Sequence, residues 1–425
     1  MKTTAAIAAQ LEGYDPQALR ASSVNDFLSH LVEPVVTDEI TGIFQALGRV
    51  LSSDIISPIS VPPHDNSAMD GYAFSGGQLS VLTANNPVLK LRVMGTAMAG
   101  KAWQGSVLSG ECLKIMTGAV LPPGLDTVVP QEFVCADGST ISFPRSVLQP
   151  GDNRRRLGED LMQGKAALKA GDLLTPAALG LLASMGIAEV KVWRKLRVAY
   201  FSTGDEILSL GEAPREGAVF DSNRYTVFGL LSRLGCEVID MGVVRDEPAQ
   251  LEAAFTQAAT QADAIITSGG VSVGEADHTK HMMKKLGDVA FWKIAMRPGR
   301  PMAVGRIGTS MLFGLPGNPV AVMVTFLAFV RPALLTMMGC TAKTPPLLKA
   351  HCTLALRKKP GRTEYQRGTV SRGADGRLRV QAIGNQGSGV LSSMVQANGL
   401  IVLHHDQGNI AVDDEVDVMM FEGVI

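Results

Sequence analysis

Residues 195–340 alternate apolar runs with amphipathic stretches, and this feature restricts the possible folds more than any other. The pattern predicts strands at 197–201, 237–244, 263–267, 289–294 and 311–313, and helices at 223–234, 248–262, 278–286 and 319–338. Such alternation is typical of an α/β domain whose doubly wound, mostly parallel sheet has helices on both faces. Ligands of these sheets bind at the carboxyl ends of the strands, so a site is expected in the loops there.

The rest of the chain has a different texture, which predicts a multidomain protein of the α/β plus β class. Residues 1–22 read as a flexible lead-in, and residues 23–60 as helical and then extended. Short strands broken by Gly and Pro predict a small β domain at 61–150. A loop and a helix follow within 151–194, and alternating short strands predict a β-barrel-like or sandwich domain at 345–425.

Charge and cysteine content exclude several classes of protein. The formal net charge is −1, from 39 basic and 40 acidic residues, so no global field would gather nucleic acid or an anionic membrane. The longest apolar run, 320–330, is too short to span a bilayer, and the N-terminus lacks the apolar core of a secretory signal. Five scattered cysteines without a Cys-x-x-Cys pair argue against a disulfide framework or a zinc site. We therefore expect a cytoplasmic protein without nucleic-acid or membrane partners.

Three loops at predicted strand ends have unusual compositions. They are FSTGDE (201–206), SGGVSVGEAD (268–277) and GLPGNP (314–319). Their small residues let the backbone approach a phosphate, and carboxylates such as Glu206 and Asp277 could hold a metal beside it. One such loop is often only a tight turn, but three at one sheet edge favour a ligand site. None matches the G-x-G-x-x-G or Walker pattern, which disfavours generic dinucleotide or NTP binding.

Positive charge is concentrated in FWKIAMRPGRP (291–301). Lys293 and Arg297 lie at even spacing, so on one strand they would face one side and could bind an oxyanion, although a solvated face is the alternative. Two polar segments lie outside the α/β region, PHDNSAMDGY (63–72) and NRRRLGED (153–160). Each is compatible with turn chemistry or a solvated loop, and a site shared between domains would explain both.

An ordered set of motifs gives the chain a resemblance to a known family. The set comprises PPHDNSAMDGYA, KIMTGAVLPPG, NRRRLGED, FSTGDE, SGGVSVGEAD and GLPGNP, followed by GRTEYQRG and NQGS. Over about residues 23–425 the chain resembles molybdopterin molybdenumtransferases of the MoeA/gephyrin type. The SGGVS-x-G-x-x-D pattern alone is shared with related molybdopterin-binding proteins, including the adenylyltransferases, whereas DNSAMDGYA and the C-terminal domain belong to the transferase.

The resemblance implies an elongated homodimer of four-domain subunits. Residues 23–60 and 151–194 would form one discontinuous domain, 61–150 would be inserted into it, 195–340 would bind the pterin and 345–425 would be the C-terminal β domain. The active site would lie between the α/β domain and domains of the partner subunit. The implied reaction converts adenylated molybdopterin and molybdate into molybdenum cofactor and AMP, with Mg²⁺ as cofactor. The adenylyltransferase and cofactor-accepting enzymes would be further partners.

The resemblance also implies roles for individual residues. Catalytic residues would be Asp70 and Thr117, supplied across the dimer, together with Asp160, Glu206, Asp246 and Asp277. The last four would also be the metal ligands. Substrate binding would involve Thr203, Gly204, Gly269, Gly270, Ser272, Pro316, Gly317, Asn318 and Pro319. Molybdate would be bound by Lys293, Arg297, Arg300, Arg367 and Ser388.

One departure and two alternative functions remain open. The family commonly has lysine where this chain has Arg297 and Arg300, and the flatter, forked guanidinium leaves the affinity for molybdate open. A molybdopterin adenylyltransferase would need only the α/β domain, and a fusion would show a second SGGVS-type loop. A scaffold or carrier protein would require an added linker or partner groove, and no long Pro/Ser-rich linker is present. The sequence does not separate molybdate from tungstate, which have nearly the same size and charge.

Overall fold

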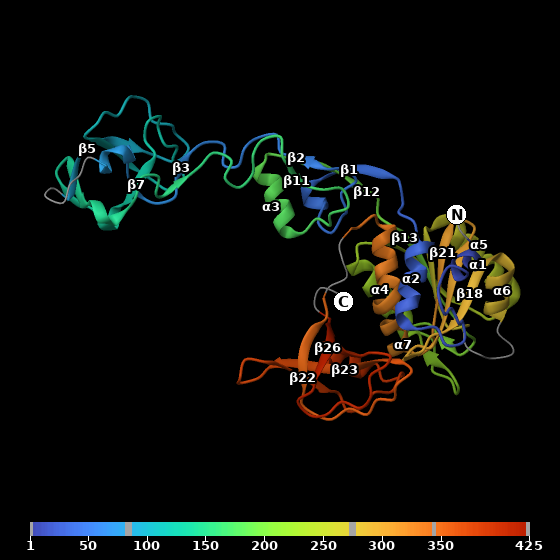
Figure 1. The fold of residues 1–425 in the computed structure, drawn as a ribbon. Coiled ribbons are helices and arrows are strands. Elements are labelled where there is room, and N and C mark those ends of the chain that lie inside the picture. The colour runs from blue at the N-terminus through green and yellow to red at the C-terminus, as the bar shows by residue number, and fades with distance from the viewer. Residues whose placement is uncertain (1–2, 81–86, 272–277, 342–345, 422–425) are drawn as a thin grey trace.

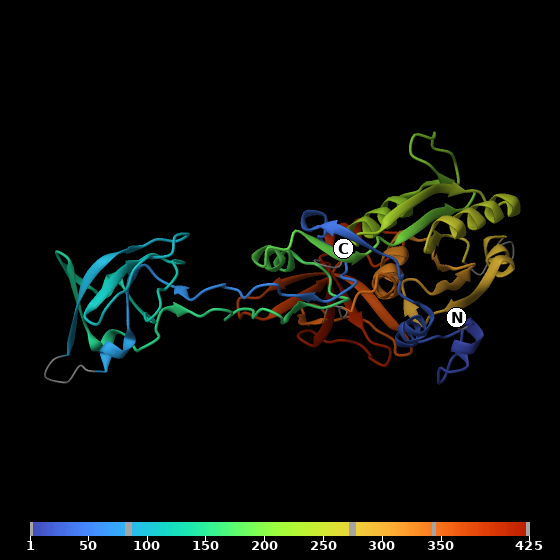
Figure 2. The ribbon, with the colours of Figure 1, turned by 90° about the horizontal axis from the view of Figure 1, so that it is seen from above.

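The computed structural model describes residues 3–80, 87–271, 278–341 and 346–421, which form an elongated, curved molecule (Figure 1, Figure 2). An α/β domain lies at one end beside a C-terminal β-barrel, and a small middle domain follows. The inserted β domain lies at the far end, joined to the middle domain by two extended chain segments. The chain therefore leaves the middle domain, forms the inserted domain and returns.

The α/β domain contains a six-stranded sheet of order β16-β13-β17-β21-β20-β18. The strands are β13 (Arg197–Thr203), β16 (Glu237–Val244), β17 (Ala264–Ser268), β18 (Gly287–Lys293), β20 (Pro301–Ile307) and β21 (Ser310–Leu315). The first four in spatial order are parallel, whereas β20 and β18 are antiparallel to their neighbours. The predicted mostly parallel sheet is confirmed. The prediction missed β20, which joins β21 through a tight turn at Gly308 (φ 59°) without a crossover helix.

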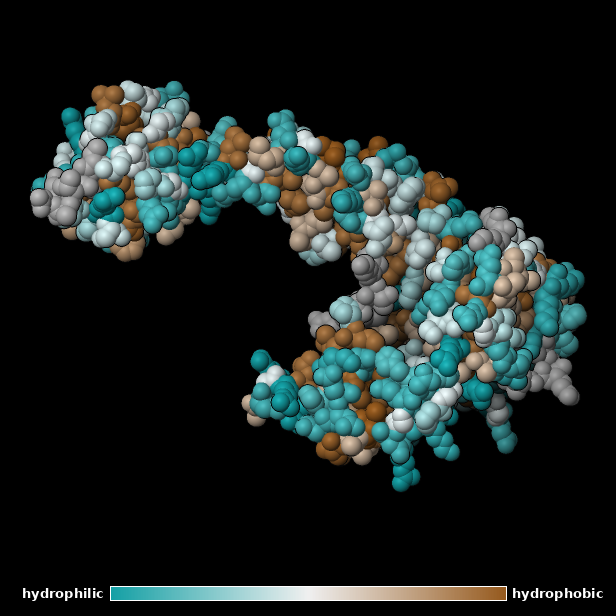
Figure 3. Space-filling view, in the orientation of Figure 1, coloured by the Kyte–Doolittle hydropathy of each residue, from teal (hydrophilic) through white to brown (hydrophobic). Residues whose placement is uncertain are grey.

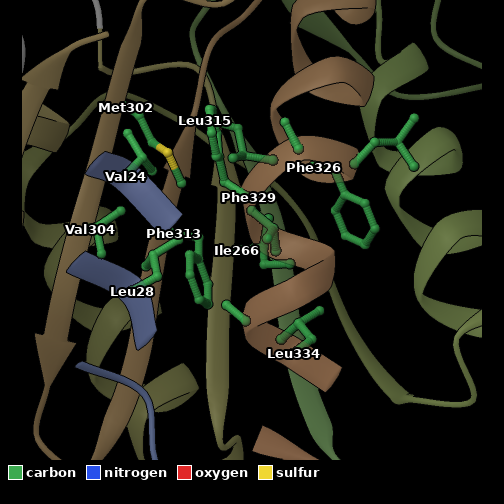
Figure 4. Close-up of a cluster of buried hydrophobic side chains, with 14 of the residues drawn as sticks. Val24, Leu28, Ile266, Met302, Val304, Phe313, Leu315, Phe326, Phe329 and Leu334 are labelled. Atoms are coloured by element: carbon green, nitrogen blue, oxygen red, sulfur yellow. The ribbon is translucent and has the colours of Figure 1, made fainter. Parts of the chain in front are cut away.

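Helices cover both faces of this sheet. They are α4 (Ser222–Arg233), α5 (Pro248–Gln261), α6 (His278–Leu286), α7 (Pro319–Thr325) and α8 (Arg331–Met337), with a π-helical turn at Phe326–Val330 between the last two. Side chains of α4, α7 and α8 pack in one hydrophobic core with one face of the sheet, and those of α5 and α6 in a second core on the other. Figure 4 shows Phe313 and Leu315 of β21 clustered with Phe326, Phe329 and Leu334 in the first core.

The continuous helical segment Pro319–Met337 is long and apolar enough to cross a membrane by length and composition. It is the one such helix in the part of the chain that the structure describes, and 78% of its apolar window is buried inside the protein. Its apolar character is explained by packing against the sheet, since a helix that is hydrophobic all round belongs in a core.

The N-terminal segment differs from the prediction in two ways. Described residues of the expected flexible lead-in form α1 (Thr4–Ala8), where Ile7 is 1% exposed and the Thr4 backbone N–H donates to the Asp288 carboxylate at 2.7 Å. α2 (Ala21–Leu31) was expected to belong to the middle domain, but it packs on the α/β domain. Figure 4 shows its Val24 and Leu28 beside the sheet. The apolar face of α2 is buried against the α/β domain, in the same hydrophobic core as residues of α8.

The middle domain is built from two separate stretches of chain. β1 (Asp38–Gly42) pairs with β12 (Glu189–Trp193), and β2 (Ile55–Ile56) pairs with β11 (Ala166–Leu168). α3 (Pro176–Ser184) packs in the same hydrophobic core as these strands through Ala178 and Leu182. Each pairing joins a strand from the first stretch with a strand from the second, so neither stretch completes the domain alone.

The inserted domain is attached by the two-stranded ladder β3 (Asn66–Ser67) with β10 (Arg154–Arg155). Its own sheet has the order β7-β4-β6-β5-β9-β8. The strands are β4 (Gly71–Phe74), β5 (Val88–Ala97), β6 (Glu111–Ile115), β7 (Thr127–Pro130), β8 (Cys135–Asp137) and β9 (Thr140–Pro144). This domain has separate hydrophobic cores of its own.

The C-terminal domain is a five-stranded barrel with a short helix, α9 (Ser392–Gln396). Its strands are β22 (Leu348–Cys352), β23 (Thr363–Arg372), β24 (Leu378–Ala382), β25 (Gly399–Leu403) and β26 (Glu415–Met420). The barrel closes because β23 pairs with both β24 and β25. A short strand of the α/β domain, β19 (Met296–Arg297), adds to β23 in parallel and joins the two domains.

Candidate functional site

A cavity of about 880 Å³ lies where the carboxyl ends of the parallel strands meet the barrel. The strand-end loops supply a large part of its lining, namely Thr203, Glu206, Ser268, Gly269, Gly270, Pro316, Gly317, Asn318 and Pro319. The barrel supplies Gln386, Ser388 and Gly389. Two hydrogen bonds join the sides, from Asn318 Nδ2 to Ser388 Oγ (3.0 Å) and from the Val320 backbone N–H to the Ser388 carbonyl (3.1 Å). All three predicted loops therefore reach the same cavity.

Two glycines of the second loop are required by close approach as well as by backbone conformation. Gly269 has φ 88°, and a Cβ atom there would collide with the Thr203 carbonyl oxygen. Gly270 has φ 63°, and a Cβ atom there would collide with the side chain of Thr279 on α6. L-residues with side chains rarely adopt these angles. The loop is therefore drawn tightly over the strand ends, with its backbone on the cavity surface.

A buried hydrogen-bond network lies beneath the cavity floor. Tyr200 Oη is 2.9 Å from Ser202 Oγ and 2.7 Å from Ser268 Oγ. Asn223 Nδ2 donates to the Gly317 carbonyl (2.7 Å) and to Ser268 Oγ (3.4 Å). Burial raises the pKa of Tyr200, despite the opposing hydrogen bonds, so the phenol remains a neutral donor at physiological pH. The network fixes β13, β17 and the loop after β21 relative to one another.

Positive charge in the cavity comes from Arg297 and Arg300. The prediction that Lys293 and Arg297 share one face of a strand is wrong. β18 ends at Lys293, and Arg297 belongs to β19, which pairs with Glu364 of the barrel strand β23. Lys293 is half-buried and lies outside the lining of this cavity. The chain turns between these residues because the Ala295 carbonyl accepts a hydrogen bond from the barrel, the Thr363 N–H at 2.9 Å.

Arg367 lies behind the barrel wall of the cavity and is 1% exposed. Its guanidinium donates to Ser393 Oγ at 3.0 Å, to the Asn385 carbonyl at 3.2 Å and to the Gly387 carbonyl at 2.9 Å. Burial lowers the pKa of Arg367, and the nearby Arg297 charge adds to this effect. In this arrangement Arg367 holds the turn that carries Ser388, and it is not part of the cavity lining.

The predicted metal-binding carboxylates do not all lie at one site. Glu206 lines the cavity, and Asp246 accepts a hydrogen bond from the Thr279 hydroxyl (3.1 Å) at the start of α6. Asp160 is exposed where the chain re-enters the middle domain, beside Val61. Asp277 and Ser272 lie outside the described residues. Among the residues that are described, no group of three or more His, Cys, Asp or Glu could hold a metal ion.

A second polar cluster lies at the base of the inserted domain, far from the cavity of the same chain (Figure 1). The Thr117 N–H and hydroxyl both donate to Asp70 Oδ1 at 2.7 Å. Both hydrogen bonds lower the pKa of Asp70, and the one from the Thr117 hydroxyl has the larger effect. Asp65 pairs with Arg154 at 2.5 Å, and β3 pairs with β10 beside them. The structure thus brings together the two polar segments that the sequence placed about 90 residues apart, 63–72 and 153–160.

Sequence reasoning missed part of the cavity lining. Asp221 and Asn223, at the start of α4, line the cavity, as does Gln386 of the barrel. Asp221 is the N-cap of α4, and its Oδ1 accepts the Arg224 N–H at 3.1 Å. An acidic N-cap at the strand-end side of the sheet was a usable signal, but capping alone explains such a residue. Gly204 was predicted to bind substrate; it follows the lining residue Thr203 and is not in the lining itself.

Three family models match consecutive parts of the chain. They are MoeA_N, "MoeA N-terminal region (domain I and II)", over residues 20–186; MoCF_biosynth, "Probable molybdopterin binding domain", over 199–336; and MoeA_C, "MoeA C-terminal region (domain IV)", over 349–421. The second model covers the sheet and strand-end loops of the cavity, and the third covers the barrel that closes it.

Individual proteins match along nearly the whole chain. The chain is 44% identical over 400 residues to a molybdopterin molybdenumtransferase of Haemophilus influenzae, which covers 94% of this chain and 97% of the relative. It is 36% identical to molybdopterin molybdenumtransferase 2 of Mycobacterium tuberculosis, over 88% of this chain and 93% of that relative. The crystal structure of the molybdopterin biosynthesis moeA protein from Pyrococcus horikoshii OT3 superimposes with a TM-score of 0.81 at 26% identity, covering 95% of this chain and 100% of that chain.

Proposed function

The chain belongs to the MoeA family and is a molybdopterin molybdenumtransferase of molybdenum cofactor biosynthesis, and we propose that it transfers molybdenum from molybdate to adenylated molybdopterin. In the proposed reaction the two dithiolene sulfurs bond to molybdenum, and one molybdate oxygen leaves as water with the two thiol protons. One water cleaves the phosphoanhydride of the adenylated substrate and releases AMP. Molybdate is therefore a substrate, and the protein supplies binding, orientation and charge.

The cavity between the α/β domain and the barrel is the observation that carries this proposal. At about 880 Å³ it has the size of a site for a small organic ligand. Glycine-rich strand-end loops on one side allow backbone N–H groups to approach phosphate oxygens. Arg297, Arg300 and the Ser388 hydroxyl on another side provide cations and a donor for a tetrahedral oxyanion. We propose that the pterin phosphate lies against the strand-end loops, with molybdate near the two arginines.

Magnesium would be held by carboxylates near the second loop. Glu206 lines the cavity, and Asp246 lies beside Thr279 at the start of α6, the helix that directly follows the segment containing Asp277. Carboxylate oxygens are ligands that Mg²⁺ prefers, so Glu206 and Asp246 are chemically suitable, and further ligands would have to come from outside the described residues or from the substrate. When bound, Mg²⁺ offsets the negative charge of the pyrophosphate linkage. Glu206 and Asp246 would orient that linkage for attack by water.

We propose a homodimer, because Asp70 and Thr117 belong to the inserted β domain, which lies at the far end of the chain from the α/β domain and the barrel (Figure 1). A partner subunit could bring its Asp70 and Thr117 to the cavity and complete the site. The middle domain has a surface suited to such an interface, since Val36 is 83% exposed, Ile40 is 70% exposed and Phe44 is 91% exposed. Figure 3 shows hydrophobic residues on the surface of this domain. Large apolar side chains gathered on a surface are typical of protein interfaces.

We further propose that the protein is cytoplasmic. Free cysteines fit a reducing cytoplasm. In that compartment the adenylyltransferase would deliver the adenylated pterin, and cofactor-accepting enzymes would receive the product.

Release of AMP from adenylated molybdopterin in the presence of Mg²⁺, with and without molybdate, tests the proposed function. Release that depends on molybdate, together with formation of active molybdenum cofactor, is the expected result. Tight binding of the adenylated pterin without release of AMP would contradict catalysis and favour a carrier or scaffold protein. Adenylation of molybdopterin by ATP would instead indicate the adenylyltransferase.

A further inference from the structure

The two arginines of the cavity lie on one loop, residues 294–300, which joins β18 to β20 and which we name the arginine loop. Arg297 and Arg300 are exposed and line the cavity, whereas Pro298 and Gly299 between them are buried. The backbone that carries two long side chains sets which ligand atoms their guanidinium groups can reach. The position of the arginine loop therefore decides where the positive charge of the cavity lies.

Two sides of the arginine loop are held by the barrel and by α7. The Thr363 N–H of the barrel strand β23 donates to the Ala295 carbonyl at 2.9 Å. On the other side the loop lies so close to α7 that a Cβ atom at Gly299 would be 2.6 Å from Thr325 Oγ1. Both contacts connect the loop to elements that also border the cavity.

A third side of the loop is held by residues 3–19, which we name the N-terminal segment. The Pro16 carbonyl accepts the Lys293 N–H at 2.8 Å, and the Leu19 N–H donates to the Lys293 carbonyl at 3.2 Å. The Leu19 carbonyl accepts the Ala295 N–H at 2.8 Å, and Leu19 is 2% exposed. Ala295 is therefore bonded through its N–H to the N-terminal segment and through its carbonyl to the barrel.

Aromatic and polar contacts dock the N-terminal segment along β18. Trp292 Nε1 donates to the Tyr14 hydroxyl at 2.9 Å, and Trp292 is 2% exposed. The Tyr14 ring stacks on Phe27 of α2 with ring centroids 6.1 Å apart, and Phe27 meets Trp292 edge-on at 4.9 Å. At the opposite end of β18, α1 lies beside the strand, and Thr4 donates to the Asp288 carboxylate (Figure 1). The segment thus has one anchor next to the arginine loop and another at the far end of β18.

We propose that the N-terminal segment positions Arg297 and Arg300 for molybdate. Tyr14 and Leu19 are the positioning residues, because they contact the end of β18 and neither lines the cavity. This inference rests on the proposed function, in which both arginines bind the oxyanion. If the segment were released, the arginine loop would lose its hydrogen bonds on one side while the barrel and α7 still held the others. A misplacement of about 1 Å in a binding group can cost on the order of 100-fold in rate, so a small shift of the loop is sufficient.

Two matched substitutions in the full chain test the proposal. Leu19→Ala removes the buried side chain that holds the segment next to the arginine loop. Ile7→Ala is the control, because Ile7 is 1% exposed, belongs to the same segment and the same hydrophobic core, and lies on α1 at the far end of β18. Both substitutions create a comparable cavity in that core, so an effect that acts only through stability would be common to both. Thermal unfolding verifies that each variant is folded.

The first measurement is AMP release at varied molybdate and at varied adenylated molybdopterin, with Mg²⁺. Leu19→Ala should raise the molybdate concentration for half-maximal rate at least about 5-fold and change the KM for adenylated molybdopterin less than about 2-fold. Ile7→Ala should change both values less than about 2-fold. A wild-type molybdate dependence in Leu19→Ala, or an equal increase in Ile7→Ala, would overturn the proposal.

The second measurement is amide hydrogen exchange of residues 293–300, followed by mass spectrometry. Exchange there should be faster in Leu19→Ala than in the wild-type protein and in Ile7→Ala, because the Ala295 N–H loses its partner when the segment opens. Unchanged exchange would overturn the proposal. Failure of the proposed function is a separate outcome, in which the wild-type protein releases no AMP although exchange of the loop still responds to Leu19→Ala.

Should Leu19→Ala fail to fold, Tyr14→Phe is measured in the same two ways. It keeps the ring on Phe27 and removes the hydroxyl that accepts the buried Trp292 N–H. The expected increase in the molybdate concentration for half-maximal rate is about 2- to 5-fold, since one hydrogen bond is lost. An unchanged molybdate dependence together with unchanged exchange of residues 293–300 would contradict a positioning role for the segment.

Discussion

Replacing Arg367 with alanine tests whether the barrel contributes to molybdate binding. The Arg367 side chain is 1% exposed, and its guanidinium donates three hydrogen bonds, two of them to carbonyls of the turn at 385–389. Ser388 lies in this turn and lines the cavity. Alanine removes the three donors, leaves buried carbonyls without partners and opens space behind the turn. The Ser388 hydroxyl would then lose the support that holds it towards the cavity.

The size of the effect follows from these contacts. Hydrogen bonds to charged groups contribute about 1.5–3 kcal/mol each. The three cannot simply be added, because they share one guanidinium group and are coupled. We expect about 1.4–2.8 kcal/mol of the loss to appear as weaker molybdate binding, which corresponds to about a 10- to 100-fold higher molybdate concentration for half-maximal rate. The KM for adenylated molybdopterin should change much less, because the strand-end loops are on the other side of the cavity.

The assay is AMP release at varied molybdate concentration, with Mg²⁺ and saturating adenylated molybdopterin. Arg372→Ala is the matched control, because Arg372 lies on the same strand, is exposed and donates to the Gly376 carbonyl at 3.2 Å, outside the cavity. The control should have the molybdate dependence of the wild-type protein. If Arg367→Ala also shows the wild-type dependence while thermal unfolding confirms its altered stability, the turn at 385–389 does not bind molybdate and the reasoning is wrong.

Three further predictions concern stability, assembly and the distant polar cluster. Asp263→Asn breaks the pair with Arg194, in which both N–O distances are 2.7 Å, and should lower the free energy of unfolding by about 2 kcal/mol at pH 7. Burial alone would raise the pKa of Asp263, but the hydrogen bonds from Arg194 outweigh it and lower the pKa. The stabilisation is therefore present above about pH 4 and is lost as the pH falls through the folded-state pKa, so urea midpoints of variant and wild type should converge in acid; a constant difference would contradict this. Phe44→Glu should halve the mass measured by light scattering, and an unchanged dimer mass would exclude that surface as the interface. Thr117→Val removes the hydroxyl that donates to Asp70 and should lower kcat for AMP release by about 10-fold in a folded protein, whereas a wild-type kcat would remove this pair from the proposed site.

Much of the α/β domain could be predicted because its periodicity is strong. The predicted strand 237–244 and helix 278–286 have the observed limits. β20 was missed because its sequence, PMAVGRI, follows a Pro-Gly turn and contains Gly305, whose missing side chain lets β18 approach. α2 was recognised as amphipathic but assigned to the wrong domain. An apolar helix face shows that the helix is buried, but it does not show against which domain.

The candidate site was predictable where it depends on local backbone chemistry. The three strand-end loops were found because glycine and proline mark tight turns, and the sheet topology brings such loops together. The position of Arg297 could not be predicted, because it depends on a strand pairing with the barrel more than 60 residues later in the sequence. The family resemblance implied that Arg367 is a molybdate ligand. A buried guanidinium can face a ligand or the backbone carbonyls of a nearby turn. Which of the two it faces depends on tertiary packing, which a single sequence does not specify.

The pairing of β3 with β10 holds the two ends of the inserted domain together, so the domain can be exchanged as a unit. Its entry and exit points, Asn66–Ser67 and Arg154–Arg155, are paired neighbours, so they lie only about 5 Å apart. A segment with adjacent ends can be deleted, replaced or lengthened without altering the path of the remaining chain. A genetic change confined to the inserted domain could therefore alter the side chains that it would present to the proposed partner subunit, while the α/β domain and the barrel still fold. Recombination could in this way vary the part of the proposed shared site that lies in the inserted domain independently of the cavity.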